Sequence, residues 1–445
     1  MWIAPKSSNP RRNHKTKRPS KDVFLSTVII SSLVLYSPIV VHGESIVAMV
    51  GVGEVPLGLA YDSGKGEVFV ASNNGTISVI SDSTNGVVAK INLGPRSLPH
   101  DLAYDAAKGE VFVTTQYGGE EKVYVISDAT NTVVAKVPWP STSVADVVYD
   151  SGNGEIYVAN PGWSVLSKPG GPIIVQSNSS IFVVSDATNT IVANISLGSV
   201  PADLVFNSSK SDRPLPIDMV YDSGKGEIFV TDSVYNYTSG VEVASTVSVI
   251  SGITNTVVAT VDIGGGTHPE GLAYDSVRGE VFVANSNGTN VSVISDATNA
   301  LVANVRVEAE PTGHEAGTRL LGITYDPAKG EVFVANNGDY LPNTVSVISD
   351  ATNTVVATVD VGYGPAGVVY DSGKGEVFVA NSGDDTVSVI SDAAPVPEFP
   401  SPYAVPSVLL TAIGASIGIY ALIRRQNPSH GVVRESVTRQ EEVRR

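Results

Sequence analysis

One sequence pattern recurs along the whole chain and restricts the fold more than any other feature. It is a Tyr-Asp pair with a glutamate five residues after the aspartate. Successive tyrosines are 43 to 72 residues apart. The seven tyrosines are Tyr61, Tyr104, Tyr149, Tyr221, Tyr274, Tyr325 and Tyr370. A period of this size predicts a propeller, a solenoid or an array of small domains.

Each unit contains four short runs rich in β-branched residues, such as "AGVVYD", "EVFVAN", "TVSVISD" and "TVVATVDVG". Turn sequences such as "SGKG" and "DATN" separate them, and no run has helical length with helical spacing. Continuous apolar runs such as "VFVA" are typical of strands buried on both faces. The pattern therefore predicts an all-β, seven-bladed propeller with four strands in each blade.

The seventh unit is incomplete, because the chain turns into "AAPVPEFP" where the outermost strand should follow. The missing run, "TVVATVDVG" in the sixth unit, resembles "SIVAMVGVG" at residues 45–53. We therefore expect the N-terminal strand to complete the last blade and to close the ring. Closure would remove the exposed edges that otherwise invite aggregation.

Units such as "VSVISDATNTVVATVDVG" and "GEVFVAN" resemble the YVTN-type β-propeller repeats of archaeal and bacterial surface-layer-associated proteins. The resemblance covers about residues 44–392. Members of that family serve as adhesins, scaffolds and occasionally enzymes, so the resemblance implies a fold and leaves the function open. The sequence "PEFP" at 397–400, with the apolar run and Arg-Arg that follow, resembles archaeal C-terminal surface-sorting signals. Twenty further residues follow here, so a retained anchor is the alternative to processing.

Both ends of the chain predict contact with a membrane. Residues 1–43 combine a basic start with an apolar run, which indicates a secretory signal peptide, or an uncleaved anchor as the alternative. The propeller is expected at 44–394, followed by a Pro-rich linker at 395–402. Residues 403–423 are uncharged and, as a helix, would be about 31 Å long, which suits a transmembrane helix.

Arg424 and Arg425 follow this span, which predicts a cytoplasmic tail at 424–445 and an extracellular propeller. Gly414 and Gly418 form a GxxxG pair that could mediate a homodimer. The net charge is −17, and the basic residues gather towards both ends, so the body is strongly acidic. Such a surface argues against nucleic-acid partners. The chain has no Cys, which excludes disulfides and thiolate metal sites.

Insertions affect only two of the four kinds of inter-strand loop, at residues 162–180, 199–217, 232–245, 308–319 and 338–343. In a propeller these two kinds of loop share one face, so the insertions predict a binding face, with neutral drift as the alternative. Aromatic residues suited to recognition lie in them: Trp163, Tyr235, Tyr237 and Tyr340. Sequons for N-glycosylation, most of them in or beside these loops, are at Asn74, Asn178, Asn194, Asn207, Asn236, Asn287 and Asn290.

Three adjacent blades depart from the repeat three residues before the tyrosine, where the innermost strand meets the channel. Four blades have Gly58, Gly271, Gly322 and Gly367 there, whereas the other three have Asp101, Asp146 and Asp218. Asp203 is an alternative to Asp218. Converging carboxylates predict a hard-cation site, for Ca²⁺ before Zn²⁺, with a solvated acidic rim as the plainer alternative. Further candidates at the channel mouth are His100, Glu270, His314 and Glu315.

The sequence contains no HExxH, GxSxG, phosphate-loop or DxDxDG motif. We therefore expect a cell-surface binding or adhesion protein that recognises a protein or a glycan through its insertions and is not an enzyme. The alternative is an extracytoplasmic, metal-assisted lyase or lactonase-like hydrolase with its site at the channel mouth. A purely structural role in the cell envelope is the third hypothesis.

Overall fold

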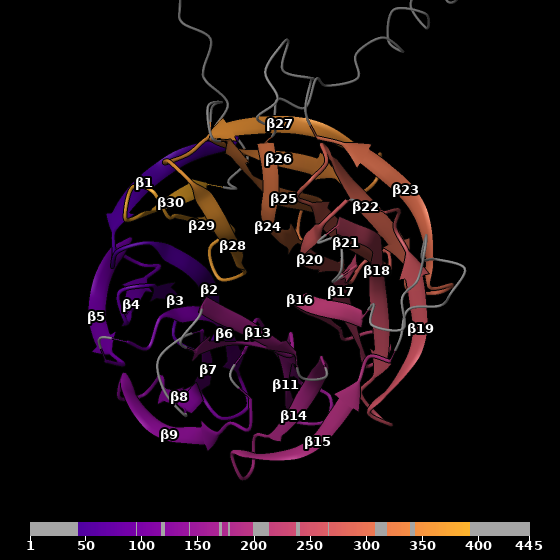
Figure 1. Ribbon diagram of the computed structural model, residues 1–445. Coiled ribbons are helices and arrows are strands. Elements are labelled where there is room, and N and C mark those ends of the chain that lie inside the picture. The colour runs from indigo at the N-terminus through magenta and orange to yellow at the C-terminus, as the bar shows by residue number, and fades with distance from the viewer. Residues whose placement is uncertain are drawn as a thin grey trace, which may run out of the picture. The chain divides into compact units, whose positions relative to one another are not determined.

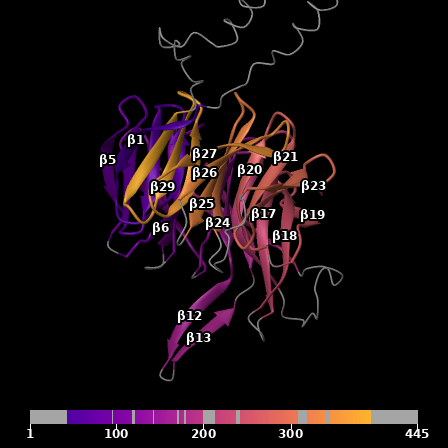
Figure 2. The ribbon, with the colours of Figure 1, turned by 90° about the horizontal axis from the view of Figure 1, so that it is seen from above.

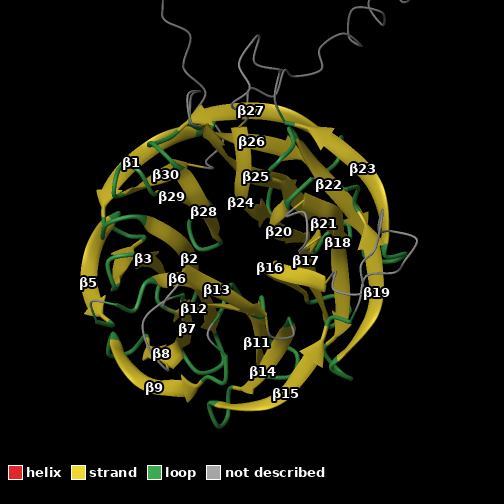
Figure 3. Ribbon diagram, in the orientation of Figure 1, coloured by secondary structure: helices red, strands yellow, loops and turns green. Residues whose placement is uncertain are grey.

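The computed structural model describes residues 43–391, apart from residues 95, 117–120, 142, 169–170, 177–178, 199–212, 237–240, 266, 308–317 and 339–342. Seven four-stranded antiparallel sheets are arranged as blades around a central axis (Figure 1). The described residues form strands, turns and loops without a helix (Figure 3). The predicted all-β, seven-bladed propeller is therefore confirmed.

The strands of each blade follow one another from the channel to the rim. Blade 1 is β2 (Pro56–Asp62), β3 (Glu67–Ser72), β4 (Thr76–Ser81) and β5 (Gly86–Asn92). Blade 2 is β6 (Pro99–Asp105), β7 (Glu110–Thr115), β8 (Glu121–Ser127) and β9 (Thr132–Pro138). Blade 3 is β10 (Val147–Asp150), β11 (Glu155–Asn160), β14 (Ser180–Ser185) and β15 (Thr190–Ser196), and carries the additional hairpin β12 (Trp163–Lys168) and β13 (Gly171–Gln176).

The remaining blades repeat this order. Blade 4 is β16 (Arg213–Asp222), β17 (Glu227–Asn236), β18 (Val241–Ser251) and β19 (Thr256–Asp262). Blade 5 is β20 (Pro269–Asp275), β21 (Glu280–Asn285), β22 (Asn290–Ser295) and β23 (Ala300–Arg306). Blade 6 is β24 (Thr318–Asp326), β25 (Glu331–Gly338), β26 (Thr344–Ser349) and β27 (Thr354–Asp360). Blade 7 is β28 (Pro365–Asp371), β29 (Glu376–Asn381), β30 (Thr386–Ser391) and β1 (Ser45–Gly51).

The hydrophobic core lies between neighbouring blades. In β3 the side chains of Val68, Phe69 and Val70 are fully buried, because alternate residues face the blade on either side. Phe69 packs in one cluster with Val111 and Val113 of blade 2. This arrangement explains why the second strand of every blade is apolar without alternation.

Blade 7 is closed as the sequence predicts. Strand β1 pairs antiparallel with β30, from Ser45 opposite Ser391 to Gly51 opposite Thr386. Val50 of β1 is buried and packs in one cluster with Val389. The Ser45–Ser391 pair stands where the other blades have a covalent turn between the third and the outermost strand. The described chain therefore starts and stops on the same face of the ring.

We call this face the turn face; it carries the turns after the innermost and the third strands. The opposite face, which carries the other two kinds of connection, is the loop face. On the turn face, Gly66 has a φ of +67°, and an added Cβ would lie 2.4 Å from Asp82 Oδ2. Only glycine fits both the conformation and the space. Asparagines of the second kind of turn, such as Asn131 at φ +52°, also adopt the left-handed region.

The signature residues of the repeat join each blade to the next on the turn face. Between blades 1 and 2, Tyr104 Oη of blade 2 lies within hydrogen-bonding reach of Asp62 of blade 1, and it also donates to Asp128 Oδ2 of its own blade at 3.2 Å. Lys65 Nζ of blade 1 donates to the Asp128 carbonyl of blade 2. Burial, followed by these carboxylates, raises the pKa of Tyr104 far above its ordinary value, so the phenol stays a neutral donor. We call this Tyr–Asp–Lys arrangement the clasp.

The clasp also forms between blades 7 and 1, beside the β1–β30 pairing that closes blade 7 without a covalent turn. Tyr61 of blade 1 hydrogen-bonds Asp371 of blade 7, and Lys374 Nζ donates to the Asp82 carbonyl. The repeated Tyr-Asp pair and the lysine three residues beyond it are therefore residues of inter-blade contacts. Their recurrence needs no catalytic explanation.

Blades 3 and 4 are joined by a different set of contacts. Here Asn153 stands in place of the lysine and Gly252 in place of the aspartate, and Asn153 Nδ2 donates to the Gly252 carbonyl at 2.9 Å. Tyr157 stands where most other blades have phenylalanine, and its Oη donates to Asn255 Oδ1 at 2.6 Å. At this seam, hydrogen bonds among Asn153, Tyr157 and Asn255, which also donate to Glu155, replace the lysine contact of the clasp.

No helix of the described residues is long and apolar enough to cross a membrane. The predicted signal peptide, the Pro-rich linker, the span at 403–423 and the Gly414/Gly418 pair all lie outside the described residues.

Candidate functional site

A cavity of about 630 Å³ lies on the propeller axis, and the innermost strands line it. Aspartates line one side of this cavity and glycines line the other. The carboxylates of Asp101, Asp146 and Asp218 belong to blades 2, 3 and 4, which are neighbours in the ring. Glycines such as Gly322 and Gly367 line the other side. The structure thus brings together the three aspartates that the sequence singles out.

Packing explains why four blades need glycine at this position. A Cβ on Gly322 would lie 2.3 Å from the Ala366 carbonyl of the next blade, and one on Gly367 would lie 2.3 Å from the Leu57 carbonyl. The residue falls in a β-bulge, as between Pro216 and Met219 around Asp218, and bulges redirect side chains. In blade 3, β10 begins only after Asp146 and pairs without a bulge.

Asp146 is buried and Asp218 is partly buried, and the two acids have different surroundings. Asp218 accepts backbone hydrogen bonds from Met219 N at 2.7 Å and from Leu272 N at 3.2 Å. Burial raises the pKa of Asp218 to about 7, although these bonds and one from Asp146 oppose the shift. Asp146 Oδ2 has no hydrogen-bond partner. Burial, followed by the charges of Asp218 and Asp101, raises the pKa of Asp146 well above its ordinary value. Burial and mutual repulsion therefore favour a proton within this group of acids.

Two threonines accompany the aspartates, at a strand position where the other blades have alanine. Thr231 Oγ1 accepts a hydrogen bond from Asp218 N at 3.0 Å and donates to the Glu270 carbonyl of blade 5 at 3.0 Å. Thr114 Oγ1 accepts from Asp101 N at 3.2 Å. Each threonine hydroxyl thus forms a hydrogen bond with the backbone of an aspartate that lines the cavity. Comparing the repeats position by position would have revealed these threonines from the sequence.

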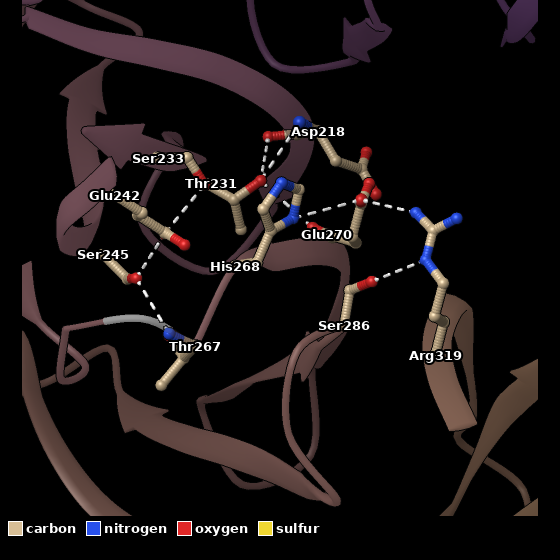
Figure 4. Close-up of polar contacts among 10 residues, drawn as sticks. All are labelled: Asp218, Thr231, Ser233, Glu242, Ser245, Thr267, His268, Glu270, Ser286 and Arg319. Carbon is tan, nitrogen blue, oxygen red and sulfur yellow. Dashed lines mark hydrogen bonds and ion pairs between the residues drawn. The ribbon is translucent and has the colours of Figure 1, made fainter. Parts of the chain in front are cut away.

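Glu270 is the centre of a second polar cluster at the channel mouth (Figure 4). Its Oε1 lies 3.3 Å from His268 Nδ1 and 3.6 Å from Arg319 Nη2, and Arg319 Nε donates to Ser286 Oγ at 3.2 Å. The hydrogen bond to Glu270 raises the pKa of His268 and outweighs the opposite effect of burial. Neither His268 nor Arg319 is predicted from the sequence. Both residues lie beside the start of an innermost strand, at His268 before β20 and at Arg319 in β24. This position next to the channel could have identified them as candidates in the sequence.

The other predicted mouth residues are not brought into this cluster. The His100 ring lies 3.0 Å through Nδ1 from the Ala145 carbonyl and thereby links blades 2 and 3. His314 and Glu315 lie outside the described residues, as does Asp203. Asp218 occupies the innermost strand of blade 4. Among the described residues, no group of three or more His, Asp or Glu is arranged to hold a metal ion. A Ca²⁺ site at the three aspartates stays a prediction.

The insertions form a projecting surface on the loop face, which consists of the hairpin β12–β13 and the lengthened ends of β17 and β18 and which we call the relief. Residues 162–180 contain the hairpin β12–β13, which projects from the ring, and β17 and β18 are lengthened together to 10 and 11 residues (Figure 2). These insertions are strands, whereas the sequence predicts loops. Trp163 lies in β12 and Tyr235 in β17, while Tyr237 and Tyr340 lie outside the described residues.

The sequons occupy several kinds of position. Asn74 and Asn287 are exposed in loop-face turns, Asn290 begins β22, and Asn194 is exposed on the outermost strand of blade 3. Asn236 ends β17, and Asn178 and Asn207 lie outside the described residues. The exposed asparagines are sterically open to modification, and glycosylation itself stays a prediction.

A solved structure with a similar fold is hydrazine synthase from Kuenenia stuttgartiensis, with a TM-score of 0.60 and 14% sequence identity. The similarity covers 76% of this chain and 96% of that chain. At this identity it supports the propeller fold alone. No protein-family model and no curated protein sequence matches the chain.

Proposed function

We propose that the protein is a membrane-anchored, extracellular propeller of the YVTN surface-layer-associated kind that binds a surface protein or a glycan through its loop face. One observation carries the proposal. The hairpin β12–β13 and the lengthened strands β17 and β18 stand on the loop face, whereas Ser45 and Ser391 lie together on the turn face.

The position of these two ends fits an anchor that follows the propeller. Residues 392–402 can span at most about 40 Å between Ser391 and the predicted membrane span at 403–423. An anchor there would hold the turn face towards the membrane and direct the loop face outward. A binding surface on a cell-surface protein needs this orientation.

The relief itself is suited to recognition. An isolated two-stranded hairpin is marginally stable in water, so β12–β13 would gain stability from a bound partner. The sequence of the hairpin, "WSVLSK" and "GPIIVQ", is rich in apolar residues. Tryptophan is enriched in binding hot spots, and Trp163 begins this hairpin.

A lyase or hydrolase with its site at the channel mouth is the second candidate. The contact between Glu270 and His268 favours it, because the raised pKa of the imidazole is the property of a proton donor near neutral pH. In that case Glu270→Gln would abolish turnover in a substrate screen and leave the binding of surface partners unchanged.

The binding proposal is tested on protein and glycan arrays with the full-length protein in detergent. In one variant, residues 161–179 are exchanged for the short turn 382–385 of blade 7. The control is Ser223→Ala, an exposed site on the turn face. We expect the parent and the control to bind the same ligands and the exchange variant to lose them. Binding that survives the exchange, or a parent that binds nothing, would overturn the proposal.

A further inference from the structure

The acidic side of the channel has no positive side chain to balance it. Among the described residues that line the cavity, three are aspartates and none is Lys, Arg or His. Asp146 is only 5% exposed, and its Oδ2 has no hydrogen-bond partner. A buried carboxylate oxygen without a donor is costly, and the hydrogen-bond partners of the Asp146 side chain are themselves the acids Asp101 and Asp218. The group therefore favours a proton or a cation that brings its own donors.

The rest of the cavity favours an organic cation over an inorganic one. Opposite and beside the acids, Leu59, Leu272 and Ile323 line the wall together with glycines. Tyrosines of the innermost strands line it too, and aromatic rings attract ammonium groups. The volume of about 630 Å³ is that of a small-molecule site. A bare metal ion would leave the apolar wall uncovered and would find no ready-made ligand group among the described residues.

We propose that the channel binds a small primary amine, with its ammonium group among Asp101, Asp146 and Asp218 and its apolar body against the glycine and leucine side. A primary ammonium has three N–H donors, which match three carboxylates on adjacent blades. Without such a cation, a proton held within the group of three acids relieves part of the repulsion. The ligand supplies this positive charge instead. The site is separate from the surface relief, so this proposal does not depend on the proposed function.

The test is calorimetric titration of the full-length protein at neutral pH and constant ionic strength. The probes are n-butylammonium, which has N–H donors and an apolar tail, and tetramethylammonium, which has the same charge without donors. The variants are Asp146→Asn and Asp101→Asn. Asp360→Asn is the matched control, because this aspartate is exposed on the outermost strand β27.

We expect the parent and Asp360→Asn to bind butylammonium equally, and each channel variant to bind it at least about tenfold more weakly, as loss of a charge-assisted hydrogen bond implies. Tetramethylammonium should also bind at least about tenfold more weakly. Equal binding of the two probes, or undiminished binding by channel variants that keep the parent's circular dichroism spectrum, would overturn the proposal. Displacement of butylammonium by Ca²⁺ at equal ionic strength would instead assign the acids to a metal. The exchange variant of residues 161–179 should bind butylammonium as the parent does, which separates this result from the surface proposal.

Discussion

The two faces of the ring are built in opposite ways. On the turn face, the same side chains recur from blade to blade and reach a neighbouring blade, as Lys65 does at Asp128 and Tyr104 at Asp62. On the loop face, contacts are local to a few blades, as in the Glu270 cluster of blades 5 and 6 and the hairpin of blade 3. Because one face fixes the spacing of the blades, the other can change length and chemistry without opening the ring.

The clasp stabilises the ring because the same contacts recur at several boundaries between blades. A single hydrogen bond between partly exposed groups contributes only about 1 kcal/mol. The same contacts are present next to the β1–β30 seam, where Lys374 of blade 7 reaches blade 1 and Tyr61 of blade 1 reaches blade 7. The comparison therefore predicts large effects from changes at the turn face or the seam, and small ones from changes to the relief.

Removal of the closing strand should have the largest effect. Deletion of residues 44–53 exposes the edge of β30 and uncovers the apolar cluster in which Val50 lies. Unpaired, apolar strand edges associate, so we expect aggregates in place of a monomer. Size-exclusion chromatography and thermal melting measure both properties.

The exchange of residues 161–179 is the matched loop-face change, and it should leave a monomer with nearly the parent melting temperature. The comparison between the faces fails if this exchange unfolds the protein, or if the truncated protein stays monomeric and equally stable.

The second prediction concerns Asp232, a buried acid at the loop-face end of β17. The same position holds Asn in four other blades, where the amide hydrogen-bonds a neighbouring hydroxyl such as Ser292 Oγ. Ser248 Oγ donates to Asp232 Oδ2 at 2.6 Å instead. Burial raises the pKa of Asp232 from 3.8 to about 7, and the hydrogen bonds from Ser248 only partly oppose this shift.

A raised pKa in the folded state means that the unfolded chain loses this proton first as the pH rises. Asp232 therefore lowers stability progressively between about pH 4 and pH 7. We expect Asp232→Asn to stabilise the protein by an amount that grows by about 1.4 kcal/mol per pH unit over this window, to an order of 4 kcal/mol. Urea unfolding at several pH values measures it. A pH-independent difference between variant and parent would show that the acid is already ionised.

The third prediction compares two turn-face glycines with the same backbone conformation. Gly66 has a φ of +67° and Gly226 of +68°, yet only Gly66 has a carboxylate against its Cα, because Gly252 replaces that aspartate in blade 4. Alanine in the left-handed region costs roughly 1–2 kcal/mol. Gly226→Ala should show this cost alone, whereas Gly66→Ala should add roughly 1–3 kcal/mol for the steric conflict with Asp82. Equal losses in chemical denaturation would mean that Asp82 moves aside freely.

Sequence alone predicts those parts of this molecule that repetition determines. The period gives the number of blades, and the incomplete last unit reveals the closing strand, because a missing strand must be supplied from elsewhere in the chain. The three aspartates also converge as expected, since equivalent positions in adjacent blades must be neighbours in space. An alignment of the seven units would also have shown that Thr231 and Asp232 differ from the residues at the same positions in most other blades.

Features without a repeat equivalent could not be predicted in this way. Residues 162–180 carry no strand signal that the other units share, so the hairpin β12–β13 was expected to be a loop. The contacts of Glu270 with His268 and Arg319 depend on local backbone conformation, including the positive φ of His268. The clasp, although built from signature residues, needed the structure, because sequence order does not show which blade each side chain reaches.

The last prediction uses the seam between blades 3 and 4, where the lysine contact is absent, and its effects should be the smallest. Tyr157 Oη donates to Asn255 Oδ1, whereas the equivalent oxygen is buried without a partner in five other blades. Tyr157→Phe should cost about 1 kcal/mol, which is the value of one buried hydrogen bond. The converse change, Phe282→Tyr, should offer a hydroxyl to the unpartnered Asn353 Oδ1 and recover up to about 1 kcal/mol. A double-mutant cycle with Asn353→Ala isolates that bond from the added bulk. A stabilisation that persists without Asn353 would arise from packing, and a loss in both backgrounds would show that the phenylalanine seams have no room for a hydroxyl.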